Sequence, residues 1–130
     1  MTPSRYSDVL ALLADYYDGL YRLDTARLRE VFSPSAQYAT IVQGTHLSLS
    51  VDEYLPRVEE RQPPADTGTP YEFTVRSIRF AGDHTALAEV ECTLFGNDYT
   101  DFLSLLRIDG RWRIQAKVFE GVPRGAKEVS

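Results

Sequence analysis

Residues 99–119, YTDFLSLLRIDGRWRIQAKVF, decide the fold of this chain. They read as two long apolar arms around Asp109-Gly110, a pair typical of tight hairpins. Both central positions of such a turn need a positive φ, which glycine adopts freely and aspartate better than most residues. Asp101 and Lys117 interrupt the arms. Since strand side chains alternate between faces, a carboxylate and an ammonium on opposite arms can share one face. We predict that they meet in a sheltered pocket.

Length and composition exclude several classes of protein. The chain has 130 residues, 43% of them hydrophobic, and a net charge of −5. The size fits one domain with a real core. Without a basic stripe we expect no nucleic-acid partner, and without a long apolar run we expect no membrane span. The N-terminus lacks the apolar core of a signal peptide, and Cys92 is the single cysteine. We therefore expect a cytoplasmic protein.

The rest of the chain predicts helices first and strands afterwards. Apolar residues at helical spacing predict helices over residues 4–22 and 25–32, the second capped by Asp24. A short strand over 37–42 and a loop with Gly44 follow. Ser50 and Glu53 form a capping box that opens a third helix, which Pro63-Pro64 ends. Strands over 71–80 and 85–95 complete a four-stranded antiparallel meander with the hairpin.

This order is that of an α+β domain. We expect one domain over residues 1–122 and a flexible tail over 123–130. A strongly twisted sheet of this length curves, and the N-terminal helix is expected to fill its concave side. Three modest helices do not fill the whole concavity. The sequence therefore predicts a central cavity, which some of the eight tyrosines are suited to line.

Several phrases of the sequence resemble a known family. They are Tyr17-Asp18-Gly19-Leu20 followed by Asp24, the run VFSPSA over 31–36, the capped helix from Ser50, and the hairpin from Tyr99 to Phe119. Over roughly residues 6–120 the chain resembles the nuclear transport factor 2-like superfamily, and within it the putative lumazine-binding family. The resemblance implies a cystatin-like cone: a curved antiparallel sheet wrapped around the first helix, with a central pocket. It also implies a homodimer through the convex face of the sheet.

The superfamily includes ketosteroid isomerases and polyketide cyclases besides pure binding domains, so the fold alone does not fix the function. Ketosteroid isomerases carry a general-base aspartate near the end of the first strand. Here that neighbourhood reads Tyr38, Ala39, Thr40 and Ile41, without a carboxylate. The resemblance relates Tyr17 to their pocket tyrosine and Asp101 to their second acid. Steroid-type proton abstraction is not expected.

The candidate site residues follow from these patterns. For the ligand pocket we predict Tyr17, Tyr38, Tyr54, Tyr99, Asp101 and Lys117, with His46 at the mouth and Asp101 as the candidate catalytic acid or base. The alternative for Asp101 and Lys117 is a structural ion pair that fixes the hairpin register. The two histidines and Cys92 show no metal-ligand spacing, and no phosphate-binding loop is present. We expect neither a metal nor a cofactor.

Three functions remain open from the sequence. The first is a homodimer that binds a small, partly apolar molecule. The second is a cofactor-free isomerase, dehydratase or cyclase that uses Asp101. The third is a dimeric scaffold with a filled pocket. An ammonium beside Asp101 opposes the rise in carboxyl pKa that burial causes, which favours ligand recognition over acid–base catalysis.

Overall fold

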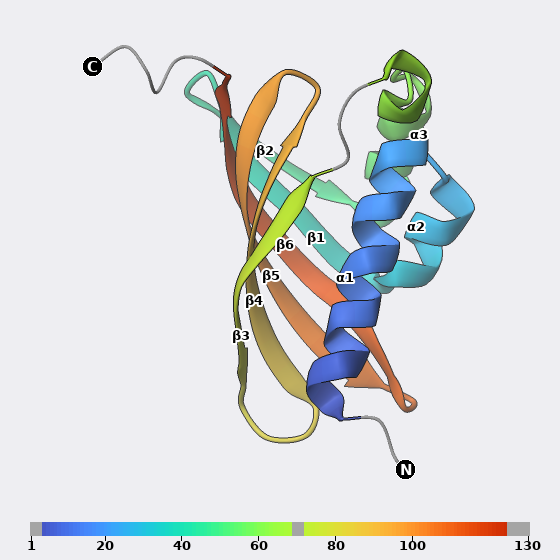
Figure 1. Ribbon diagram of the computed structural model, residues 1–130, viewed down its shortest axis with the longest axis vertical. Coiled ribbons are helices and arrows are strands. Elements are labelled where there is room, and N and C mark those ends of the chain that lie inside the picture. Colours follow the sequence, from blue (N-terminus) through green and yellow to red (C-terminus); the bar gives the residue numbers. More distant parts are fainter. Residues whose placement is uncertain (1–3, 69–71, 125–130) are drawn as a thin grey trace.

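The computed structural model describes residues 4–68 and 72–124. Three helices, α1 (Arg5–Arg22), α2 (Thr25–Val31) and α3 (Val51–Glu59), lie together on one side of a six-stranded curved sheet (Figure 1). A 3₁₀ turn over Pro64–Thr67 follows α3. The strands are β1 (Phe32–Val42), β2 (Thr45–Ser50), β3 (Phe73–Phe80), β4 (Thr85–Leu94), β5 (Asn97–Ile108) and β6 (Arg111–Pro123). The α+β cone is thus confirmed.

Side-chain caps fix where the helices begin. The Ser4 hydroxyl accepts from the amide of Ser7 at the start of α1, and Asp24 accepts from the amide of Arg27 at the start of α2. The capping box of Ser50 and Glu53 is present in full at α3. These bonds satisfy donors that the first turn of a helix leaves free.

Helix α1 fills the concave side of the sheet. Its buried residues recur on one face and include Val9, Leu13, Tyr16, Tyr17 and Leu20. Gly19 lets α2 approach closely, because a Cβ at this position would lie 2.9 Å from Cδ2 of Leu28. Helices α1 and α2 therefore pack closely against each other.

The sheet order is β2-β1-β6-β5-β4-β3. All neighbours are antiparallel except β1 and β6, which are parallel. The turn between β5 and β6 has positive φ at Asp109 and Gly110, as the sequence predicts. The hairpin lies in the middle of the sheet, with β6 between β1 and β5 and β5 between β6 and β4.

The sequence-based strand assignment was wrong at the start of the sheet. Residues 45–50 form β2 instead of a loop, because Gln43 and Gly44 both take positive φ and close a tight turn. Strand β1 begins at Phe32 and runs through Pro34, where its pairing with β6 is irregular and needs no ladder donor. The four-stranded meander is therefore part of a six-stranded sheet.

Smaller differences concern the ends of elements. Strand β4 stops at Leu94 and β5 already begins at Asn97, so the turn consists of Phe95 and Gly96. Strand β6 extends to Pro123, inside the predicted tail; residues 125–130 of that tail lie outside the described residues, as does Tyr71. No helix of the described chain is long and apolar enough to cross a membrane.

Candidate functional site

The hairpin turns Asp101 of β5 and Lys117 of β6 to the helix side of the sheet. Lys117 stands opposite Leu103, two residues from Asp101 and on the same face. Lys117 Nζ lies 3.5 Å from Asp101 Oδ2. Asp101 is 0% exposed and Lys117 is 5% exposed. The two charges therefore form one buried ion pair.

Two neighbouring tyrosines of α1 complete the polar cluster. The Tyr17 hydroxyl donates to Asp101 Oδ2 at 2.7 Å, and Lys117 Nζ donates to the Tyr16 hydroxyl at 2.8 Å. Tyr16 is not among the predicted pocket residues. Adjacent side chains on a helix point about 100° apart, so a prediction from helical spacing can place Tyr17 in the pocket without its neighbour Tyr16. The helix reaches both charges because their strands stand in the middle of the sheet.

Burial and charge set the protonation states of the cluster. Burial lowers the pKa of Lys117, but the Asp101 carboxylate, with smaller contributions from Tyr38 and Tyr54, outweighs it and the pKa is raised. Lys117 is therefore an ammonium throughout the physiological range. Burial, followed by the Asp101 charge, raises the pKa of Tyr17 well above the ordinary value and that of the Cys92 thiol to about 12. Both stay neutral donors.

One atom of the cluster is left without a partner. Asp101 Oδ1 is buried and has no hydrogen bond to any described residue. Oδ2 takes both the Tyr17 hydroxyl and the Lys117 contact. Burying a carboxylate oxygen without a hydrogen-bond donor lowers the stability of the folded protein. Stability alone therefore does not explain the Asp101–Lys117 pair.

A small, partly open cavity of about 20 Å³ lies beside Lys117. We call it the aromatic hollow. It is lined by Leu20, Tyr38, Tyr54, Arg61, Cys92, Leu94, Phe95, Tyr99, Lys117 and Phe119. Four of the predicted pocket residues, Tyr38, Tyr54, Tyr99 and Lys117, are thus brought together. Tyr17 and Asp101 do not line it; they lie behind Lys117 and hold its ammonium in place.

Packed rings form the inner walls of the aromatic hollow. Tyr38 stacks on Tyr54 with ring centroids 4.1 Å apart, and Phe119 lies 4.8 Å from Tyr38. Lys117 Nζ lies 4.5 Å from the centre of the Phe119 ring and 5.3 Å from that of Tyr38. The Tyr99 ring occupies the place of a side chain at Gly121, whose Cβ would come within 2.5 Å of it. The ammonium therefore faces aromatic surface.

Arg61 and Phe95 form the outer wall, and both are half-buried. The Arg61 guanidinium stands over the Phe95 ring, 5.0 Å from its centre. Sequence analysis missed both residues. Arg61 follows the last residues of α3 without any motif, and Phe95 reads as the end of a strand.

The backbone at Phe95 is strained. Phe95 has φ +54° and Gly96 has φ +76°, the conformation of a turn that usually begins with asparagine. A bulky residue in this left-handed region costs roughly 1–2 kcal/mol. Asn97 holds the strained turn in place, because its side-chain amide donates to the Phe95 carbonyl and to the Tyr99 hydroxyl. The turn thus fixes two walls of the aromatic hollow at once.

Comparison with known proteins places this fold and site in a family. The model of the family described as "Putative lumazine-binding" matches residues 4–120. The chain belongs to the putative lumazine-binding family. Among curated proteins, this family member is 29% identical over 126 residues to "Aldolase FrzH" of Cladobotryum sp, covering 95% of this chain and 97% of the relative.

Solved structures agree on the fold of this member of the putative lumazine-binding family. An NTF-2 like protein of unknown function from Silicibacter pomeroyi DSS-3 is 28% identical, with a TM-score of 0.82 over 94% of this chain and 100% of the other. A domain with a cystatin-like fold from Nostoc punctiforme is 20% identical, with a TM-score of 0.69 over 98% and 83% of the two chains. The nuclear transport factor 2-like fold is confirmed.

His46 does not lie at the mouth of the aromatic hollow in this member of the putative lumazine-binding family. It sits on β2 opposite Ile41 and is exposed, while its neighbours Leu47 and Leu49 turn inward. The prediction placed His46 in a loop. In a strand, alternation carries its side chain to the face away from the helices.

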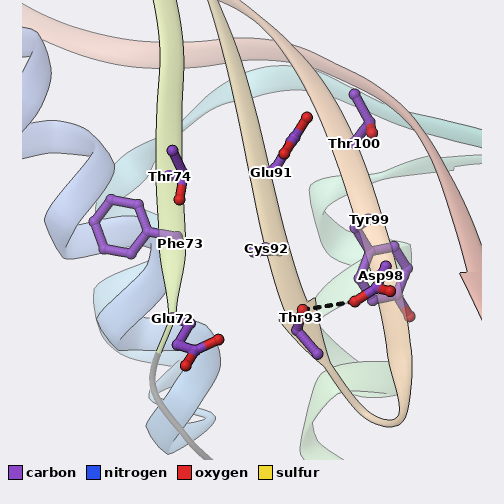
Figure 2. A pocket seen from close by; sticks show the side chains of 9 residues that line it. All are labelled: Glu72, Phe73, Thr74, Glu91, Cys92, Thr93, Asp98, Tyr99 and Thr100. Atoms are coloured by element: carbon purple, nitrogen blue, oxygen red, sulfur yellow. Dashed lines mark hydrogen bonds between the residues drawn. The ribbon is translucent and has the colours of Figure 1, made fainter. Parts of the chain in front are cut away.

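A second depression, of about 160 Å³, lies where β3 and β5 begin and β4 ends (Figure 2). Two of its three acidic residues are already engaged: Asp98 accepts from the Thr93 hydroxyl at 2.7 Å, and Glu91 pairs with Arg76 at 2.8 Å. Within the described residues no group of three or more His, Cys, Asp or Glu side chains is arranged to hold a metal ion. For this member of the putative lumazine-binding family, the aromatic hollow is therefore the better candidate site.

Proposed function

We propose that the protein binds a small, partly apolar molecule in the aromatic hollow. The observation that carries the proposal is the position of Lys117: it lines the cavity, and its ammonium lies against aromatic rings. An apolar site with one well-placed polar group is the usual form of a small-molecule pocket. Asp101 and Tyr17 act through Lys117 as positioning residues, since the pair holds the ammonium where a ligand meets it.

The ligand enters by displacing the outer wall. A volume of about 20 Å³ holds roughly one water molecule, so the closed form has no room for a ring. Tyr38 and Tyr54 of the inner wall are buried, whereas Arg61, Phe95 and Tyr99 are half-buried. The half-buried cation–π contact of Arg61 with Phe95 is worth only about 1 kcal/mol. The outer wall therefore opens at small cost.

Titration of ¹⁵N-labelled protein with lumazine and other planar heteroaromatic compounds tests this proposal. At least one compound is expected to shift the amide signals of Phe95, Tyr99 and Lys117. Tyr38→Ala is expected to weaken that binding roughly fivefold, because it removes a ring worth about 1 kcal/mol of contact. Phe102→Ala, on the other face of the sheet, serves as control and keeps the affinity. Shifts confined to other regions, with Tyr38→Ala silent, would contradict the proposal.

Catalysis is the weaker candidate. The relative from Cladobotryum is named an aldolase, which bears on the alternative of a cofactor-free enzyme. However, the raised pKa keeps Lys117 protonated, so it is unsuited to form an imine with a carbonyl substrate. Asp101 does not line the aromatic hollow. Proton transfer through Asp101 would need a substrate that passes Lys117, and the observed geometry supports binding better.

A homodimer is the second part of the proposal. The face of the sheet opposite the helices carries an apolar patch of half-exposed side chains, formed by Ile41, Leu87, Phe102 and Val118. Strand register places them on one face, since Phe102 stands beside Val118 and Leu87 beside Ser104. Exposed apolar patches of this kind favour protein–protein contacts. A second copy of the chain is the partner that the family resemblance implies.

Phe102→Glu is expected to convert the dimer into a monomer, because it places a charge at the centre of the apolar patch. Light scattering after size-exclusion chromatography measures the mass directly. Tyr6→Glu is the matched control: Tyr6 is 50% exposed but lies on α1, and its substitution leaves the mass unchanged. A wild-type protein that is monomeric at 100 µM would contradict the dimer.

The cytoplasm is the compartment that we propose. The one cysteine of the chain, Cys92, is buried and unpaired, and its pKa is raised to about 12 by burial, so its thiol is kept reduced and inert. The net charge of −5 supports the absence of a nucleic-acid partner.

A further inference from the structure

The charges around the aromatic hollow are all of one sign. Two of its ten lining residues are charged, Arg61 and Lys117, and both are cations. Lys117 is compensated by Asp101 at 3.5 Å. Arg61 forms no ion pair within residues 4–68 and 72–124. A half-buried guanidinium over an aromatic ring is therefore the one uncompensated charge at this cavity.

The rings beside Arg61 provide a flat surface. The guanidinium already rests on Phe95 and lines the same cavity as Tyr38 and Phe119 of the inner wall. A planar guanidinium presents paired N–H donors that match a carboxylate in two parallel bonds. A molecule that inserts a ring beside Tyr38 and Phe119 brings a group on its outer edge to Arg61.

The strain at Phe95 points to the same place. Asparagine adopts the first positive-φ position of such a turn at lower energy than phenylalanine does. The backbone conformation therefore does not explain why Phe95 occupies this position. Strained residues gather at ligand clamps and active sites. The Phe95 side chain meets Arg61 and the aromatic hollow, which is where a ligand needs it.

We propose that the ligand of the aromatic hollow is a planar aromatic anion of the arylcarboxylate class, with its ring against Tyr38 and Phe95 and its carboxylate on Arg61. This inference rests on the proposed function and specifies the ligand. Lys117 does not supply the selectivity, because Asp101 already neutralises it. Arg61 therefore sets the preference for a negative charge.

Benzoate and benzamide separate charge from shape, because the two have nearly the same size and only benzoate is an anion. Titrations followed by amide chemical shifts of Phe95 and Tyr99 give both dissociation constants. The wild-type protein is expected to bind benzoate at least tenfold more tightly than benzamide. Arg61→Gln is expected to weaken benzoate binding much more than benzamide binding, and so to remove this preference. Arg57→Gln, an exposed arginine of α3 away from the aromatic hollow, is the control and keeps the preference.

The outcomes distinguish this inference from the proposed function. Equal affinity of the wild-type protein for benzoate and benzamide overturns the preference for an anion and leaves small-molecule binding intact. A preference that survives Arg61→Gln also overturns it, since the charge would then be read elsewhere. If neither compound shifts signals of the aromatic hollow, both this inference and binding of small aromatic molecules fail.

Phe95→Asn tests the role of the strained turn. Asparagine suits the turn, so the variant is expected to melt no lower than the wild-type protein, and it loses the ring against which the ligand packs. Affinity for benzoate and for benzamide is therefore expected to fall together. A variant with wild-type affinity for both would show that Phe95 has no part in the site, and would overturn its assignment.

Discussion

Lys117→Met is expected to lower the free energy of unfolding by about 3–5 kcal/mol at neutral pH. Asp101 is fully buried and receives its compensation from the ammonium at 3.5 Å. Methionine fills a similar volume but leaves the carboxylate uncompensated, with the Tyr17 hydroxyl and the Cys92 thiol as its remaining donors. Equilibrium unfolding in urea measures the loss.

Two further variants show that the loss comes from the unpaired charge. Adding Asp101→Asn to Lys117→Met is expected to recover much of the stability, since no buried charge remains. Arg76→Met removes an ion pair that is shorter, at 2.8 Å, but about half exposed, and it is expected to cost less than about 1 kcal/mol. A Lys117→Met loss no larger than that of Arg76→Met would contradict the enclosed pair.

The stability loss of Lys117→Met is expected to depend on pH. The pKa of Lys117 is raised in the folded protein above the ordinary lysine value of 10.5. Its stabilising contribution is therefore complete below pH 10.5 and is lost as the pH rises through the higher folded value. The stability difference between the wild-type protein and Lys117→Met is expected to be flat around neutrality and to shrink only in strong alkali.

Trp112→Ala is expected to destabilise the protein by about 3–5 kcal/mol. Trp112 is 7% exposed and packs edge-to-face on Phe80 of β3, with ring centroids 5.8 Å apart. Removing the indole leaves a large space in the core beside the turn of the central hairpin. Thermal and urea unfolding measure the effect.

Tyr6→Ala is the matched control for this substitution, because Tyr6 is an aromatic residue of α1 that is half exposed. It is expected to cost less than about 1 kcal/mol. If Trp112→Ala is as stable as the wild-type protein, the indole is not part of the core. The assignment of this face of β6 to the core would then be wrong.

The features that sequence predicts here depend on local chemistry. Asp109-Gly110 fixes the hairpin and the capping box fixes α3, because each sets its own backbone conformation. Gln43-Gly44 makes a turn of the same kind, but glutamine is not a typical first residue, so β2 was missed. Similarly, the positive φ of Phe95 could not be predicted, because phenylalanine has no preference for that conformation.

The candidate site was predictable as far as strand alternation reaches. Alternation places Asp101 and Lys117 on one face, and their separation of 3.5 Å follows from the register of the hairpin. Arg61 and Phe95 meet only because the fold brings the segment after α3 to the turn between β4 and β5, a contact between residues 34 positions apart in the chain. No sequence pattern in either segment indicates that contact. The prediction for His46 was wrong for a related reason, because the residues expected to form a loop form strand β2.

The central claim is that the Lys117 ammonium is enclosed, compensated by Asp101, and turned toward aromatic rings. A pH titration of the lysine side-chain NMR signals tests it directly, with Lys117→Met used for assignment. The signals of Lys117 are expected to be displaced by the rings of Tyr16, Tyr38 and Phe119, and to titrate above 10.5. Undisplaced signals that titrate at or below 10.5 would contradict the account.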